Sequence, residues 1–102
     1  MTEQDLQNSI RLYLSRHGIV SFRTNVIASY TQDGRYVPSS LPKGFSDLFC
    51  VLPTGRAMFI EVKTKTGKAT PAQISFLERM REQGAIAIIA RSVEDVVDAL
   101  NI

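Results

Sequence analysis

The chain of 102 residues has little of several features that define common classes of protein. It has one cysteine, Cys50, so no disulfide can form within the chain, and its apolar neighbours Phe49 and Val51 indicate a buried structural thiol. The single histidine, His17, directly precedes Gly18 at a predicted helix end, so a histidine-based mechanism has little support. No apolar run approaches the roughly 20 residues that cross a bilayer, which excludes a membrane-spanning helix.

The amino terminus and the overall composition are typical of an ordinary globular protein. The opening residues include two acids, Glu3 and Asp5, where a secretory signal peptide would be basic, so we expect an intracellular, cytoplasmic protein. Hydrophobic residues make up 44% of the chain and charged residues 22%, which is unlike a disordered or a membrane protein. A length of 102 residues is enough for one core, so we expect a single domain over residues 1–102.

Periodicity and turn residues predict an α/β fold with a mixed sheet and helices against its faces. The second helix has the clearest start, because Thr70, Pro71 and Gln73 combine a capping box with proline at the first helical position. The expected elements are a helix over 3–16, a strand over 19–27, a long exposed loop over 30–43, a hairpin over 47–64, a helix over 71–83, a strand over 85–90 and a helix over 93–100.

The hairpin brings two carboxylates together. Its three-residue loop over 53–55 places Gly55 at the left-handed position, and in that register Leu52 faces Arg56 and Asp47 faces Glu61. Directly opposed residues of antiparallel strands have Cβ atoms roughly 4.5–5.5 Å apart. A glycine bulge in the loop would shift this register by one residue.

Two acids at that spacing repel each other unless they share a proton or a cation. A hard divalent ion with oxygen ligands satisfies both, so Asp47 and Glu61 are candidate metal ligands. Lys63 lies on the same face of the strand as Glu61, where it could orient or deprotonate an attacking water or hold a phosphate. The structural alternatives are a turn cap for Asp47, a surface position on an edge strand for Glu61 and a simple ion pair for Lys63.

Basic residues surround this acidic centre. The net charge is only +2, but its distribution suits a phosphate backbone delivered to a metal site. The alternative is a solvated basic face on a small domain. The candidate DNA-binding residues are Lys43, Lys65, Lys68, Arg35 and Arg23.

Four further residues have two explanations each. Glu3 lies on one helical line with Gln7, so both could reach the site from the helix end, or Glu3 could simply stabilise the helix dipole. Tyr30 and Tyr36 in the predicted loop could contact DNA or merely pack.

The ordered set of motifs resembles a known nuclease family. An acid at the start of the second strand and Glu-x-Lys in the third resemble the restriction-endonuclease-like αβββαβ core of PD-(D/E)XK nucleases. Ser46 stands where the superfamily motif has proline. The resemblance is narrower to the VRR-NUC branch, and it rests on Leu41-Pro42-Lys43-Gly44-Phe45-Ser46-Asp47, Glu61-Val62-Lys63-Thr64, Gly67 and Thr70-Pro71-Ala72-Gln73. The opening Glu3-Gln4-Asp5-Leu6-Gln7 and the late Ala90-Arg91-Ser92-Val93-Glu94-Asp95 also resemble that branch.

The resemblance implies a stand-alone, phage-type endonuclease that uses Mg²⁺ or Mn²⁺ and acts as a homodimer on branched DNA, especially four-way junctions. It implies that the carbonyl of Val62 is a third metal ligand and that Gln73 lies near the nucleophilic water, although the capping box alone would explain Gln73. A phage or prophage gene in a bacterial host would be the source. Two other functions stay open: a non-catalytic DNA-binding or assembly module, and an enzyme on nucleotides, which would need a closed pocket.

Overall fold

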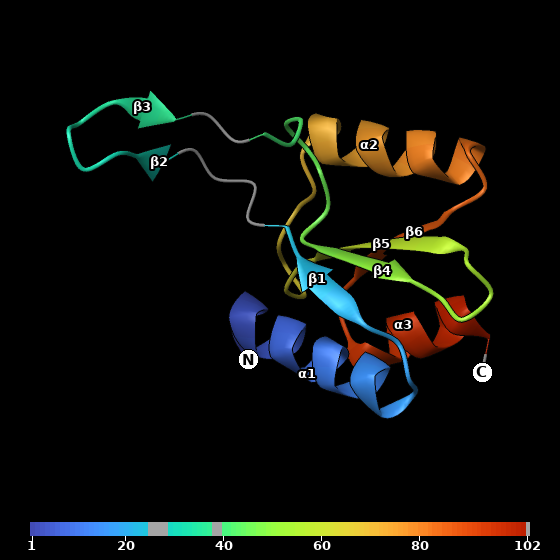
Figure 1. The fold of residues 1–102 in the computed structure, drawn as a ribbon. Helices are drawn as coiled ribbons and strands as arrows, with labels where there is room; N and C mark the ends of the chain where they lie inside the picture. The colour runs from blue at the N-terminus through green and yellow to red at the C-terminus, as the bar shows by residue number, and fades with distance from the viewer. Residues whose placement is uncertain (25–28, 38–39, 102) are drawn as a thin grey trace.

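A computed structural model describes residues 1–24, 29–37 and 40–101 of the chain (Figure 1). The elements in chain order are α1 (Glu3–Arg16), β1 (Ser21–Arg23), β2 (Ser29–Tyr30), β3 (Tyr36–Val37), β4 (Leu48–Val51), β5 (Ala57–Val62), α2 (Pro71–Glu82), β6 (Ile86–Ala90) and α3 (Val93–Leu100).

The body of the molecule is a four-stranded mixed sheet between two layers of helices. The strand order is β1-β4-β5-β6, in which β4 is antiparallel to both β1 and β5, and β6 is parallel to β5. Helices α1 and α3 lie against one face and α2 against the other (Figure 1). Helix α2 makes the crossover that a parallel step requires. The predicted α/β fold with a mixed sheet is confirmed, and it is consistent with a restriction-endonuclease-like core.

The alternation of side chains along β5 decides what each face of the sheet carries. Met58, Ile60 and Val62 are buried in the core under α1 and α3, whereas Phe59 belongs to the second core under α2. Glu61 therefore points to the α2 side, directly beyond Phe59. The carboxylate of Glu61 therefore lies at the end of the apolar side chains that β5 places under α2.

The helix starts follow the predicted capping chemistry. Thr2 and Asp5 form a capping box at α1, and Thr70 and Gln73 form another at α2. Ser92 accepts from the backbone of Asp95 at the start of α3. These side chains satisfy N–H groups that a helix start otherwise leaves without partners.

The predicted strand over 19–27 is too long. The structure gives β1 only three residues, because its sole partner β4 pairs from Cys50 back to Leu48. Residues 25–27 lie outside the described part of the chain. Cys50 itself is a buried free thiol, as predicted, and burial raises its pKa to about 11.

The predicted loop over 30–43 is wrong in part, because it contains strands. β2 and β3 pair as a small hairpin, here called the arm, which stands away from the body (Figure 1). Its turn is closed by the N–H of Thr31, which donates to the carbonyl of Arg35 at 2.8 Å. The missed signal is Asp33-Gly34, a common hairpin turn. Tyr30 and Tyr36 pack edge to face at 5.7 Å and are 72% and 60% exposed, so they stabilise the arm and still present their rings to solvent.

Candidate active site

Asp47 and Glu61 lie opposite each other at the end of the β4–β5 pair. The pairing Leu48 with Ile60 continues by one residue to Asp47 with Glu61, which is the predicted register. Gly55 has a φ of +89° in the three-residue turn that sets it. Glu61 is only 1% exposed on an interior strand, so the alternative of a surface position on an edge strand is wrong.

The backbone at Asp47 is held by side chains that the sequence did not single out. Ser46 is fully buried, and its hydroxyl donates to the carbonyl of Leu48 at 2.9 Å. The hydroxyl of Thr24 donates to the carbonyl of Ser46 at 2.6 Å, and the Thr24 N–H donates to the carbonyl of Asp47 at 3.1 Å. Ser46 thus takes a structural role at the position where the wider superfamily has proline.

The carboxylates and the lysine converge as the spacing predicts. Asp47 Oδ2 accepts a hydrogen bond of 2.9 Å from the backbone N–H of Val62, and Lys63 Nζ lies 3.6 Å from Glu61 Oε2. Glu61 Oε1 is buried and has no hydrogen-bond partner among the described residues. A buried carboxylate oxygen without a partner is costly, so this site is one proton or cation short of balance.

Burial first, and then the neighbouring Asp47, raise the pKa of Glu61 to about 8 against the opposing charge of Lys63. In the unfolded chain the same group titrates near 4.5. Between these two values the folded protein holds a proton that the unfolded chain has lost, so stability falls as pH rises through the window.

We therefore expect the free energy of unfolding in chelator to fall by about 2 to 4 kcal/mol between pH 5 and pH 8, at about 1.4 kcal/mol per pKa unit. Urea denaturation at the two pH values measures the loss. Glu61→Gln, which carries no titrating proton, should remove most of it. An equal loss in that variant would show that another group is responsible.

The residues fit a hard divalent cation. Asp47 and Glu61 offer carboxylate oxygens, of which Glu61 Oε1 is unused by any described group. No group of three or more His, Cys, Asp and Glu side chains forms a metal cluster within the described residues. Two carboxylates, a backbone carbonyl and water molecules make up a common Mg²⁺ coordination.

Glu3 and Gln7 stand at the margin of this site. Glu3 is exposed, yet it lies near enough for its charge to raise the pKa of Glu61. Gln7 is 9% exposed, and its Oε1 has no partner among the residues that the structure describes. Neither residue completes a cluster of acids around Glu61 in this structure.

Gln73 caps α2, as its position predicted, and also contacts Glu61. Its Oε1 accepts from the backbone of Thr70 at 2.9 Å, which completes the capping box of α2. Its Nε2 donates to Glu61 Oε2 at 3.1 Å. The start of α2 is thereby joined to the Glu61 carboxylate through Glu61 Oε2. Glu61 Oε1 has no hydrogen-bond partner among the described residues.

A pocket of about 250 Å³ opens beside the carboxylates, between the turn at Gly44 and the start of α2. Asp47 and Gln73 line it, and the exposed Lys43 stands at its wall. Gly44 has a φ of +89° and lies so close to α2 that a Cβ there would be 2.5 Å from the carbonyl oxygen of Ala72. Only glycine allows this approach, because the contact is with backbone atoms.

The other predicted DNA-binding residues are spread around the molecule. Lys65 and Lys68 are exposed in the segment after Lys63, and Arg23 lies on β1 with its Nη2 donating to Gln4 at 3.3 Å. Arg35 is on the arm and pairs with Asp33 at 3.2 Å. Of the five predicted DNA-binding residues, Lys43 lines the pocket beside Asp47 and the other four do not.

Arg91 makes contacts that the sequence did not predict. Its Nη1 donates to the carbonyls of Thr64 and Gly67, both at 2.6 Å, so it fixes the backbone directly after Lys63. No sequence signal pointed to these hydrogen bonds, because they join residues 24 to 27 positions apart. His17, in contrast, has the predicted structural role, with Nδ1 at 2.9 Å from the carbonyl of Tyr13 at the end of α1.

The mixed sheet, its three helices and the Asp-Glu-Lys group define a protein with a restriction-endonuclease-like core. The VRR-NUC domain model matches residues 5–94, so the chain belongs to the VRR-NUC domain family. Membership implies a nuclease, and nucleases of this family are typically metal-dependent.

Two solved structures are similar to the chain. One, titled "VRR_NUC domain", is 25% identical with a TM-score of 0.68, covering 97% of this chain and 94% of its own. Another, titled "VRR_NUC domain protein", is 20% identical with a TM-score of 0.65, covering 99% of this chain and 86% of its own, and shows likeness of fold alone. No curated protein matches the chain. None of the helices in the described residues is long and apolar enough to span a bilayer.

Proposed function

We propose that the protein is a divalent-metal-dependent endonuclease that hydrolyses phosphodiester bonds in branched DNA, four-way junctions in particular, and that it acts as a homodimer. The observation that carries the proposal is Glu61 opposite Asp47. The buried Oε1 of Glu61 has no hydrogen-bond partner among the described residues, and Lys63 lies 3.6 Å from the same carboxylate. That arrangement needs a shared proton or a cation to balance its charges, and a divalent cation can contact both acids at once.

Bound Mg²⁺ or Mn²⁺ would supply positive charge for the phosphate oxygens and acidify a water molecule. Asp47, Glu61 and the carbonyl of Val62 would hold the ion, with Glu3 as a further acid at the rim. Lys63 presents an ammonium group at the same place, either to orient the attacking water or to hold the scissile phosphate. Gln73 acts through Glu61, whose Oε2 it holds at 3.1 Å.

The choice of a polymer as substrate is supported by the shape and charge of the surface. The pocket beside Asp47 is small, at about 250 Å³, and the lysines at 43, 65 and 68 are exposed to solvent. Branched DNA and the homodimer rest on the family resemblance, since two copies of one site address two strands.

Two surfaces are candidates for contact between protomers. The last helix, α3, uses Val93, Ala99 and Leu100 against the core, which leaves it less apolar surface to offer than its sequence indicates. The arm instead exposes Tyr30 and Tyr36. We therefore favour the arm over α3 as part of the interface.

The proposal is tested with labelled four-way junction, flap and linear duplex DNA, each incubated with the protein in Mg²⁺, in Mn²⁺ and in chelator. We expect paired incisions in the junction with either metal and none in chelator. Cleavage that survives chelator would overturn the mechanism. Binding without cleavage of any DNA would favour a non-catalytic module, and competition by mononucleotides would favour a small-molecule enzyme.

A further inference from the structure

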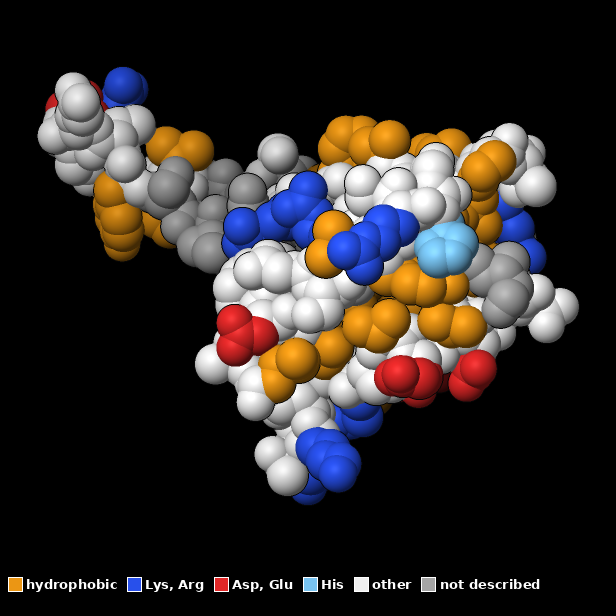
Figure 2. Space-filling view, turned by 90° about the horizontal axis from the view of Figure 1, so that it is seen from below, with side chains coloured by type: hydrophobic (Ala, Val, Ile, Leu, Met, Phe, Trp, Pro, Cys, Tyr) orange, Lys and Arg blue, Asp and Glu red, His pale blue; other side chains and the backbone are white. Residues whose placement is uncertain are grey.

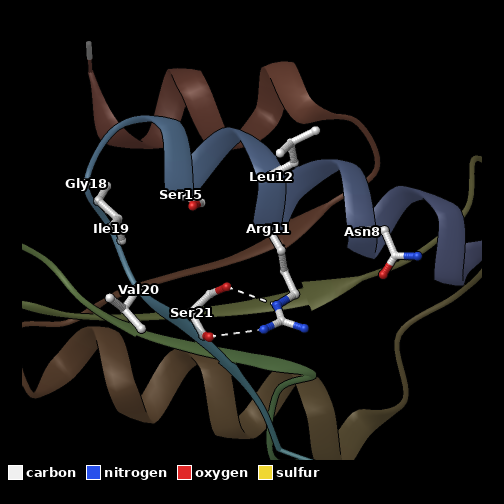
Figure 3. Close-up of a pocket in the computed structure, with 8 residues that line it drawn as sticks. All are labelled: Asn8, Arg11, Leu12, Ser15, Gly18, Ile19, Val20 and Ser21. Carbon is white, nitrogen blue, oxygen red and sulfur yellow. Dashed lines mark hydrogen bonds between the residues drawn. The ribbon is translucent and has the colours of Figure 1, made fainter.

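A second hollow of the surface lies between α1 and β1 and is separate from the Asp47 pocket. Its volume is about 520 Å³, and its polar lining comes from Asn8, Arg11 and Ser15 on α1 and from Ser21 on β1. Figure 3 shows the Arg11 side chain reaching from the helix toward the strand. We call this hollow the Arg11 groove. No acidic side chain lines it.

The guanidinium of Arg11 is fixed in place but is not neutralised. Its Nε donates to Ser21 Oγ at 3.1 Å and its Nη2 to the Ser21 carbonyl at 3.4 Å (Figure 3). Its Nη1 has no hydrogen-bond partner, and Arg11 forms no salt bridge, among the residues that the structure describes. A half-buried, oriented guanidinium with free donors matches the oxygens of an anion, because its planar fork binds phosphate in two-point fashion.

The path of β1 connects this groove to the candidate active site. Ser21 begins the strand, and Thr24, just beyond its end, donates to the carbonyl of Asp47. Three residues of extended chain span about 10 Å. Arg23 lies between them and is exposed. On the face seen in Figure 2, basic side chains form a row from the base of the arm inward.

We propose that the Arg11 groove binds a backbone phosphate of the DNA substrate other than the phosphate that is cleaved. The inference rests on the proposed nuclease function and adds a substrate contact outside the Asp-Glu-Lys site. Arg11 supplies the charge, and Asn8 and Ser15 supply side-chain donors beside it. Such contacts fix the position of the duplex and carry no base sequence.

The first test measures the salt dependence of duplex binding in a Glu61→Gln background, in which the DNA stays intact. Arg11→Gln should lower the slope of log K against log salt by about 0.9 and weaken binding about eightfold at 0.1 M salt, as loss of one phosphate contact requires. Arg79→Gln, which removes the same charge from the exposed face of α2, should change neither. An unchanged slope in Arg11→Gln would overturn the proposal.

The second test locates the phosphate. Single methylphosphonates, which lack the charge, are placed at successive positions of one strand. The inference requires one position, other than the cleaved phosphate, whose substitution weakens binding by the protein with Arg11 and has no further effect on binding by Arg11→Gln. Equal sensitivity of both proteins at every position would contradict it.

Two controls separate this inference from its alternatives. Ser21→Ala removes one hydrogen bond to Arg11 but keeps the charge, so we expect a normal slope with modestly weaker binding. This variant still tests the groove if Arg11→Gln folds poorly. If Arg11→Gln changes the oligomeric state of the protein but not its DNA binding, the groove binds a carboxylate of a second copy of the chain. That result would overturn the proposal of a phosphate site. If the wild type cleaves DNA and Arg11→Gln keeps its slope, only this inference fails; if the wild type cleaves nothing, the proposed function fails.

Discussion

Glu61→Gln is expected to lower junction cleavage by at least about a thousandfold while leaving the protein folded and able to bind DNA. The amide has the size of the carboxylate and can still contact Gln73, which lies 3.1 Å away in the parent. It has no negative charge to hold a cation beside Asp47. The loss should therefore fall on the chemical step, and single-turnover rates in saturating Mg²⁺ measure it directly.

The same variant should be more stable than the parent at pH 8 in chelator. Glu61 is buried with an unpartnered oxygen, and removing its charge relieves the repulsion from Asp47. Glu78→Gln, on the exposed face of α2, is the matched control and should alter neither stability nor cleavage. Near-normal cleavage by Glu61→Gln would remove Glu61 from the metal site.

Gly44→Ala is expected to destabilise the protein by about 2 to 5 kcal/mol, the largest effect that we predict for any single added methyl group. Left-handed strain accounts for about 1 to 2 kcal/mol of it. The remainder comes from the new Cβ, which would lie 2.5 Å from the Ala72 carbonyl oxygen and must push the turn away from α2. Native stabilities of about 5 to 15 kcal/mol leave little margin for such a loss.

Gly55→Ala separates the two causes. Gly55 has the same φ of +89° but has nothing within 4 Å of its added Cβ, so only the strain remains. Urea denaturation of both variants gives the contact contribution as the difference between them. Equal destabilisation would show that the Gly44 turn does not press on α2 as described. Because that turn leads into Asp47, we also expect Gly44→Ala to cleave DNA poorly.

The central hairpin could be predicted because its own turn determines its register. Pro53-Thr54-Gly55 fixes which residues of the two strands face each other, and once that is known the approach of Asp47 to Glu61 follows. Lys63 follows in turn from the two-residue period of a strand. These are local rules, so they hold without knowledge of the rest of the fold.

Other parts of the site depend on contacts between distant segments. The capping box predicted where Gln73 would place its oxygen, but its nitrogen reaches Glu61 only because α2 packs across β5. Arg91 holds the backbone of Thr64 through a side chain from beyond β6. No periodicity or turn signal encodes such contacts. The short β1 has the same origin, because a strand lasts only as long as its partner.

The most direct test of the account is the position of a bound cation. Crystals of the protein grown with Mn²⁺ would reveal the ion by its anomalous scattering. We predict a peak within ligand distance of carboxylate oxygens of both Asp47 and Glu61, and its loss in Glu61→Gln. If the protein cleaves DNA with Mn²⁺ but its crystals show no ion between these two acids, or an ion at another site alone, the account is contradicted.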